Sequence, residues 1–286
     1  LGLSESYAHH ANKNMWENNP RGPWIYELVA KKSSSYRFSK NGRTVVKGGH
    51  VPTLTEKGKH VFLYYQWFPK EVENRSWFDH IGVSITTDSG DSWSKPKGIN
   101  ISGVPDSVFG SQTRPMDPCA VTLANGQMRI YFTLEPFGPH DKVLGDAQIH
   151  SAISNDGINF TYEPGIRLAI SDVDLRDPAA VYFKGKWHLY IPNQRNDGTG
   201  YYASSLDGLN FVRQNNVKIS NKGNWLGNAT VAKGNISFFG TVWRATSQNG
   251  IDWKSNRSTL GPDPAIAHLR NGSWLAVTFR KIESIK

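Results

Sequence analysis

Short apolar runs alternate with turns rich in glycine, asparagine and aspartate along most of the chain. Three of these runs are Met128-Arg129-Ile130-Tyr131-Phe132, Trp187-His188-Leu189-Tyr190-Ile191 and Trp274-Leu275-Ala276-Val277. Each run has the length of a strand, and apolar positions spaced at the period of a helix are almost absent. The pattern therefore predicts an all-β protein.

One kind of turn recurs five times. Four of the copies carry an aromatic residue three positions after the glycine, namely Trp93, Phe160, Phe211 and Trp253. Asn or Asp before Gly tolerates positive φ and favours a tight hairpin, and the aromatic residue is expected to hold the next strand onto the sheet. The five copies are Ser39-Lys40-Asn41-Gly42, Asp88-Ser89-Gly90, Ser154-Asn155-Asp156-Gly157, Ser205-Leu206-Asp207-Gly208 and Ser247-Gln248-Asn249-Gly250.

A second repeat lies between these turns. It consists of Asp-Pro, a short apolar stretch, a turn containing Gly and an apolar strand, and it begins at Asp117, Asp177 and Asp263. When two degenerate copies are aligned on their Gly turns, they place His50 and, more loosely, Asn228 at the Asp position. The chain therefore contains five units.

Five units of about four strands predict a five-bladed β-propeller with four-stranded antiparallel blades. The blades are expected to begin near residues 50, 117, 177, 228 and 263. Because the chain ends about one hairpin after Asp263, the N-terminal strands within residues 26–47 are expected to complete the last blade and close the ring. Residues 1–286 are then a single domain, and the alternative is two separate β domains.

Composition agrees with a packed globular protein. Of the 286 residues, 38% are hydrophobic and ten are Trp, which supports a large core and excludes disorder. No apolar run is long enough to cross a bilayer, and residues Leu1 to Tyr7 lack an initiating Met and a targeting pattern. The single Cys119 excludes an intrachain disulfide and a cysteine-based zinc site. We expect a soluble, processed protein that is secreted or periplasmic.

The formal net charge of +9 favours an anionic partner. The lysines and arginines are scattered, however, and no nucleic-acid-binding motif accompanies them. We expect an acidic glycan as the partner, with no nucleic acid, no membrane and no cofactor. A structural cation in the central channel stays open, and the oligomeric state is not indicated.

The residues that open the innermost strands of a propeller converge at one mouth of its channel. Here they are His50, Asp117, Asp177, Asn228 and Asp263. Carboxylates that lie close together have different pKa values, which separates an acid from a base at neutral pH. For any single Asp, the alternative is that it merely stabilises the turn before its proline.

Met116-Asp117-Pro118 and Leu175-Arg176-Asp177-Pro178, together with the hairpin turns, resemble the five-bladed glycoside hydrolases of families 43 and 32. The likeness covers Ser39 to Val277. It implies a glycosidase whose first blade supplies a base or nucleophile, whose second supplies an Asp that stabilises the transition state or tunes a pKa, and whose third supplies a Glu acid.

The sequence departs from that pattern at two positions. His50 stands where the first-blade Asp belongs, and Asp177 stands where the acid is usually Glu. If Asp117 is instead the first carboxylate and Asp177 the second, the next position is Asn228, which has no carboxylic proton. The acid is then His50 or Glu135, which follows the strand that ends at Leu134, although Glu135 has the alternative of a solvated loop position.

Arginines and aromatic residues are candidates for substrate binding. Arg114 and Arg176 precede two of the aspartates and suit an anionic sugar, but each has the alternative of an ion pair with its Asp. Trp67 and Trp225 are candidates for stacking on sugar rings, with packing between blades as the alternative. Thr87 to Trp93 fits the Asp-box of sialidases, which is a structural hairpin.

Two functional hypotheses follow from the sequence. The first is a glycoside hydrolase that acts on a neutral or acidic polysaccharide or oligosaccharide, with Asp117 and Asp177 essential and Asp263, Glu135 or His50 completing the set. The second is a carbohydrate-binding propeller without catalytic activity, because neither alignment yields a complete acid and base pair.

Overall fold

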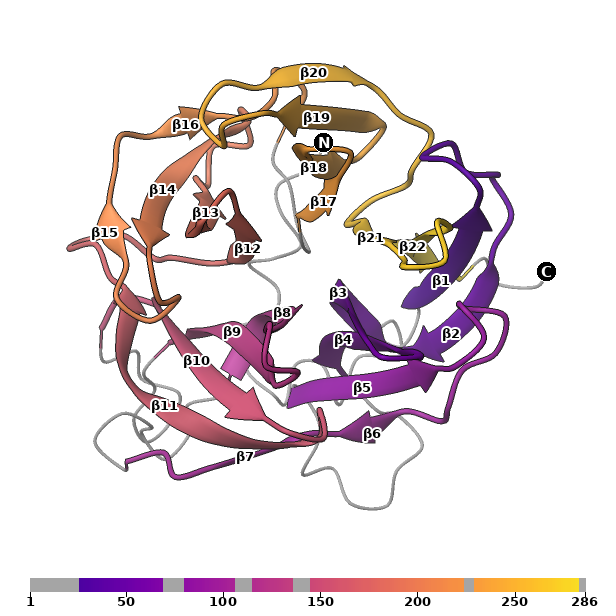
Figure 1. Cartoon of the computed structure of the whole chain (residues 1–286), viewed down its shortest axis with the longest axis horizontal. Coiled ribbons are helices and arrows are strands. Elements are labelled where there is room, and N and C mark those ends of the chain that lie inside the picture. The colour runs from indigo at the N-terminus through magenta and orange to yellow at the C-terminus, as the bar shows by residue number, and fades with distance from the viewer. Residues whose placement is uncertain (1–25, 69–79, 106–114, 136–144, 224–228, 283–286) are drawn as a thin grey trace.

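The computed structural model describes residues 26–68, 80–105, 115–135, 145–223 and 229–282. Within these ranges the regular structure consists of strands, with no helix. The strands form five small sheets arranged in a ring (Figure 1). The predicted all-β class and five-bladed propeller are confirmed.

Each blade is one sheet whose first strand lies nearest the centre of the ring. From the centre outward, blade 1 consists of β3 (Gly49–Lys57), β4 (His60–Trp67), β5 (His80–Thr86) and β6 (Lys97–Gly98), and blade 2 consists of β8 (Pro115–Thr122), β9 (Met128–Leu134), β10 (Gln148–Ser154), β11 (Asn159–Leu168) and β7 (Asn100–Ser102). Blade 3 consists of β12 (Ala179–Phe183), β13 (Lys186–Pro192), β14 (Thr199–Ser205), β15 (Val212–Arg213) and β16 (Val217–Lys218), and blade 4 consists of β17 (Thr230–Ala232), β18 (Asn235–Gly240), β19 (Trp243–Ser247) and β20 (Lys254–Arg257). Blade 5 consists of β21 (Ala265–His268), β22 (Trp274–Lys281), β1 (Tyr26–Ser33) and β2 (Arg43–Lys47).

The N-terminal strands close the ring as predicted. β1 pairs with β22 in antiparallel register from Tyr26 opposite Lys281 to Ser33 opposite Trp274. β2 then pairs with β1 and forms the outer edge of blade 5. The last blade thus joins both ends of the described chain, and neither β22 nor β1 is left as an open edge.

Two blades have five strands instead of the predicted four. β7 runs on from blade 1 and pairs in parallel with β11, so that blade 2 gains an outer strand. In blade 3, β15 and β16 both pair with β14, at different points along it. Such short outer pairings have little apolar sequence of their own, which is why the repeat pattern did not reveal them.

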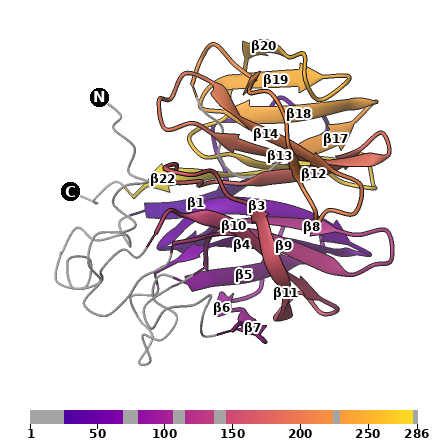
Figure 2. The same ribbon diagram turned by 90° about the vertical axis from the view of Figure 1, so that its left-hand side faces the viewer.

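The strands run from one face of the ring to the other (Figure 2). The inner strands begin on one face, here called the entry face, where Asp117 and Asp177 lie. Their hairpins to the second strands lie on the opposite face, here called the hairpin face. The five inner hairpins turn within residues 57–60, 122–128, 183–186, 232–235 and 268–274.

The core lies between the blades. Each of five hydrophobic clusters draws its buried side chains from two neighbouring blades. One cluster, for example, combines Leu28 and Leu275 of blade 5 with Leu54 and Leu63 of blade 1, all nearly inaccessible to solvent. A blade on its own exposes these surfaces, so the ring buries its apolar area only when it is closed.

The recurring turns connect neighbouring blades. In blade 3, Asp207 Oδ1 accepts hydrogen bonds from the backbone N–H groups of Leu209 and Asn210, both at 2.8 Å, and the Ser205 hydroxyl accepts one from Gly208 N at 3.0 Å. The turn thus satisfies its own polar groups. The Gly208 carbonyl then accepts a hydrogen bond from the hydroxyl of Tyr131 in blade 2 at 2.7 Å.

Two other blade junctions repeat this tyrosine contact. Tyr64 donates to the Gly157 carbonyl at 2.7 Å, and Tyr190 donates to that of Gly250 at 2.8 Å. The aromatic residue three positions after each glycine packs edge-on against the same tyrosine, with interplanar angles of 77° to 84°. The expectation that this aromatic holds the next strand of its own sheet is therefore refined, because it also contacts the preceding blade.

The tyrosine contact gives a first prediction. Tyr131→Phe removes the donor and leaves the buried Gly208 carbonyl without its partner, so we expect the free energy of unfolding to fall by about 1–3 kcal/mol. Urea denaturation measures this change. Tyr182→Phe is the control, because the Tyr182 side chain is 53% exposed and we expect it to leave stability unchanged. Equal stability of Tyr131→Phe and the wild type would contradict the prediction.

Two histidines are buried between strands. His150 is 3% exposed, and its Nδ1 lies 2.9 Å from the Tyr162 hydroxyl. His188 is 1% exposed, and its Nδ1 lies 2.9 Å from the Tyr202 hydroxyl. Burial, with a smaller effect from a nearby cation in each case, lowers the pKa of both imidazoles to about 4.

These histidines predict that acid weakens the fold. Between pH 6.5 and 4 the unfolded chain binds protons that the buried neutral imidazoles do not, so stability falls as pH decreases, by up to about 3 kcal/mol per histidine. Urea denaturation at pH 7 and pH 5 measures the loss. We expect His150→Gln to reduce the difference between the two pH values, and the comparison with wild type removes contributions from carboxyl groups. An unchanged pH dependence in this variant would overturn the assignment.

Candidate functional site

Three aspartates open inner strands on the entry face in one shared backbone conformation. Asp117, Asp177 and Asp263 have φ values of 49°, 57° and 47°, and each precedes a proline. This left-handed conformation is uncommon outside glycine, although Asp tolerates it better than most residues. The same positive φ recurs at equivalent positions of three blades, which indicates that this backbone conformation is a shared feature of the site and not a peculiarity of one turn.

Val51, and not His50, is the blade 1 counterpart of these aspartates. Val51 has φ 44° and precedes Pro52. The pairing of β3 with β4 shifts register between His50 and Thr53, as that of β8 with β9 does between Met116 and Cys119. The predicted alignment was one residue off because it counted back from the Gly turns, whose hairpin loops differ in length between the blades.

His50 lies in an aromatic environment. Its ring centroid is 4.9 Å from that of Phe279, 5.2 Å from that of Phe68 and 5.5 Å from that of Tyr26. The side chain is 7% exposed. His50 thus packs between blades 1 and 5, and the expectation that it takes the Asp position is wrong.

Asp177 is the most perturbed titratable group of the site. It is 5% exposed, and its Oδ1 has no hydrogen-bond partner among the described residues. Burial raises the pKa of this carboxyl well above its usual range, and the negative charges of Asp117 and Asp263 raise it further against the opposing effect of Arg176. This shift favours the protonated form of Asp177, the form that a general acid needs.

Glu135 and Arg176 form a buried ion pair next to Asp177. Arg176 Nη2 donates to Glu135 Oε2 at 2.9 Å, and the side chains are 10% and 6% exposed. Glu135 directly follows β9, whose end pairs with the start of β8, so it lies on the entry face with Asp117. The predicted alternative of a solvated loop position is wrong for Glu135.

The ion pair also changes the interpretation of Arg176. Burial lowers the pKa of its guanidinium, but the negative charges of Glu135, Asp117 and Asp174 raise it on balance. The guanidinium is thus held by carboxylates of the protein, chiefly by Glu135 and not by the neighbouring Asp177 that the sequence suggested. This arrangement leaves the expected capture of an anionic sugar by Arg176 without support.

Side chains on the inner strands hold the aspartates in place. Thr53 Oγ1 of blade 1 accepts a hydrogen bond from Ala120 N of blade 2 at 3.1 Å. Cys119 Sγ of blade 2 accepts one from Ala180 N of blade 3 at 3.2 Å, and burial raises the pKa of this thiol to about 11. The inner strands of neighbouring blades are therefore linked two to three residues after the positions of Val51, Asp117 and Asp177.

The remaining predicted site residues are dispersed. Asp263 is half-buried, and its charge reaches Asp177. Trp67 is the last residue of β4, is 8% exposed and belongs to the hydrophobic cluster between blades 5 and 1, so it takes the alternative role of packing between blades and not that of stacking on a sugar. Arg114, Asn228 and Trp225 lie outside the described residues.

Sequence reasoning missed Val51, although the signal was present. The dipeptide Val51-Pro52 matches the Asp-Pro dipeptides in its proline, and that proline is a better anchor for alignment than the Gly turn. At this position blade 1 supplies an apolar side chain. The described part of the site therefore has carboxylates from blades 2, 3 and 5 but none from the start of β3.

Two further observations concern the described residues. Among the described residues, no three His, Cys, Asp or Glu side chains are placed to hold a metal ion. The same part of the chain has no helix with the length and apolarity that a membrane crossing requires.

Comparison with known proteins shows a shared fold without close sequence relatives. No family model matches the sequence, and no curated protein matches it significantly. An α-L-arabinofuranosidase of family 43 from Clostridium thermocellum is similar in structure, with 14% identity, a TM-score of 0.58, and coverage of 79% of this chain and 80% of that one. The expected likeness to family 43 is thus confirmed at the level of the fold.

Two other solved structures extend the likeness. A family 117 glycoside hydrolase from Zobellia galactanivorans has 14% identity and a TM-score of 0.53, with 90% of each chain covered. A family 32 β-fructofuranosidase from Bombyx mori has 16% identity and a TM-score of 0.54, with coverage of 95% of this chain and 60% of that one. The fold is therefore that of propeller glycoside hydrolases.

Proposed function

We propose that this protein is a glycoside hydrolase and that Asp177 is its general acid. The observation that carries the proposal is the buried Asp177 carboxyl, which has a raised pKa and an oxygen without a hydrogen-bond partner among the described residues. A carboxyl with these properties donates its proton to the glycosidic oxygen as the bond to the anomeric carbon breaks. The fold shared with glycosidases supports this choice of reaction.

Asp117 is the proposed ionised partner. Its negative charge raises the pKa of Asp177, and it also interacts with the Arg176 guanidinium. As the bond breaks, Asp117 either attacks the anomeric carbon or takes a proton from the attacking water. Glu135 and Arg176 then act as positioning residues, and the charges of their ion pair stay near the reacting sugar.

A second function is favoured by one observation. Val51 lacks a carboxylate at the position where blades 2, 3 and 5 have one. The same entry face without a working base would bind carbohydrate and leave it intact. This alternative is a non-catalytic carbohydrate-binding propeller.

A broad screen decides between the two functions. Wild-type protein and Asp177→Asn are incubated with neutral and acidic oligosaccharides, and released reducing sugar is measured. We expect the wild type to release sugar from at least one substrate and Asp177→Asn to release none. Binding of an oligosaccharide without release by the wild type would establish the binding function instead.

A further inference from the structure

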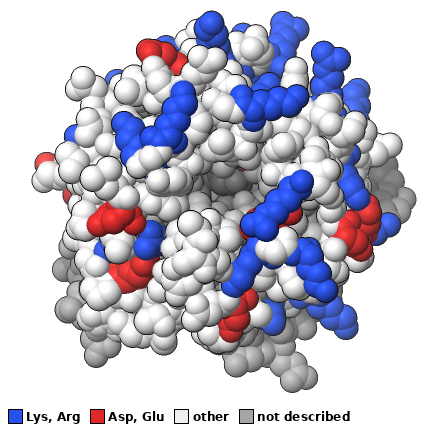
Figure 3. All heavy atoms as spheres, in the orientation of Figure 1, with Lys and Arg blue, Asp and Glu red and all other residues white. Residues whose placement is uncertain are grey.

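A ring of cationic side chains surrounds the centre of the hairpin face. The inner hairpins of four blades carry them at their tips, and Figure 3 views this face, with Lys and Arg around a central hollow. Glu56, which directly precedes Lys57, is an acidic residue beside these tips. The cationic ring consists of Lys57, Lys59, Lys184, Lys186, Lys233 and Arg270.

The cations of this ring are not held in close ion pairs with carboxylates of the described residues. No salt bridge within the described residues involves a member of the cationic ring. Lys57 and Lys184 donate to the backbone carbonyls of Asn155 and Gln248 in the next blade, which are uncharged acceptors. Glu56 contacts the ring through the backbone, because its Oε2 accepts from Arg270 N at 3.0 Å.

Within the described residues, the acidic turns farther from the centre form no salt bridge with the ring. Asp156 Oδ1 accepts from the backbone of Ile158 and Asn159, and its Oδ2 accepts from the Asn159 side chain, all at 2.8 Å. Asp207 makes the same bonds in blade 3. The carboxylates of these turns are thus occupied within their own hairpins.

Two lysines of the cationic ring occupy a backbone conformation that disfavours lysine. Lys184 and Lys233 each have φ 49°, in two-residue turns with the following glycine. Asn, Asp or Gly is preferred at that position. Unfavourable backbone geometry together with unpaired like charges around one hollow indicates a binding role and not a contribution to stability.

We infer that the cationic ring is a second binding site for a polyanionic glycan, on the face opposite the proposed active site. Sulfate or carboxylate groups spaced along one chain contact several of the ring's cations at once, and the half-exposed Tyr182 next to Lys184 offers an aromatic surface to a sugar. The choice of a glycan over other polyanions rests on the proposed function.

Binding measured in the absence of turnover tests this inference. Every protein carries Asp177→Asn, and its affinity for dextran sulfate, neutral dextran, a single-stranded DNA and phosphatidylserine vesicles is measured at 150 mM salt. The ring variant is Lys59→Gln/Lys186→Gln/Lys233→Gln. The matched control is Lys40→Gln/Lys95→Gln/Lys254→Gln, which removes the same charge from exposed positions elsewhere.

We expect the ring variant to bind dextran sulfate about tenfold or more weakly, since each lost cation removes one contact to the chain, and the control to change less than about twofold. Equal losses in both variants would mean that the net charge alone attracts the polymer and would overturn the inference. Ring-dependent binding of DNA or vesicles without binding of dextran sulfate would also overturn it. In the background without Asp177→Asn, hydrolysis by the ring variant should be unchanged, so a failure of the inference differs from a failure of the proposed function.

Discussion

Asp177→Asn is expected to lower kcat by about 10²–10⁴-fold, the usual contribution of a positioned general acid. The asparagine amide has nearly the shape of the protonated carboxyl but cannot release a proton. Because Asp177 is buried and its pKa is raised, a neutral side chain of the same shape suits its surroundings, and we expect the unfolding midpoint to stay the same or rise. Steady-state kinetics and thermal denaturation measure the two effects.

The leaving group separates an acid from a merely structural residue. An aryl glycoside with an acidic phenol releases its leaving group as a phenolate, which needs no protonation. Asp177→Asn should therefore lose much less activity on that substrate than on a natural glycoside. Asp172→Asn is the control, because Asp172 is exposed, lies five residues earlier and also has a positive φ that asparagine tolerates. Equal losses on both classes of substrate would remove Asp177 from the acid role.

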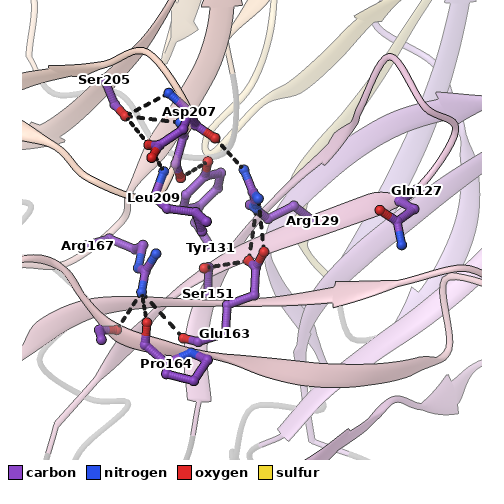
Figure 4. Close-up of polar contacts among 12 residues, drawn as sticks. Gln127, Arg129, Tyr131, Ser151, Glu163, Pro164, Arg167, Ser205, Asp207 and Leu209 are labelled. Carbon is purple, nitrogen blue, oxygen red and sulfur yellow. Dashed lines mark hydrogen bonds and ion pairs between the residues drawn. The ribbon is translucent and has the colours of Figure 1, made fainter.

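Arg129→Met is expected to lower the free energy of unfolding by about 3–5 kcal/mol, because it leaves a nearly buried carboxylate without its cation. Arg129 Nε and Nη2 donate to the two carboxylate oxygens of Glu163 at 2.8 and 2.9 Å, and Ser151 donates to Glu163 as well (Figure 4). The Arg129 and Glu163 side chains are 6% and 13% exposed. Arg129 also donates to the Asp207 carbonyl at 3.3 Å, so it connects blade 2 to the turn of blade 3.

A double variant tests whether the loss comes from the unpaired charge. Arg129→Met/Glu163→Leu replaces both ions by apolar side chains, and we expect it to recover most of the stability lost by Arg129→Met alone. Urea denaturation of the single and double variants measures the difference. A double variant that is less stable than Arg129→Met would show that the hydrogen bonds to Ser151 and Asp207, and not the charge, hold this junction.

The candidate site was predictable in part. Asp117, Asp177 and Asp263 could be singled out because each directly precedes a proline at the start of an apolar strand, which is a pattern of the local sequence. The roles of His50 and Trp67 were not predictable in this way. Their burial depends on side chains from blade 5, which the chain supplies more than two hundred residues away, at Phe279 and Leu275.

The sequence by itself determined the architecture, because strand length, hairpin turns and their repetition are local properties that any segment carries without reference to the others. The Gly turns and Asp-Pro dipeptides therefore predicted both the five blades and the closing of the ring by N-terminal strands. Only the tertiary structure decided the chemistry of the aspartates. The pKa of a carboxyl depends on its burial and on nearby charges, and closure of the ring both buries Asp177 and brings the charges of Asp117 and Asp263 near it, so that its pKa is raised.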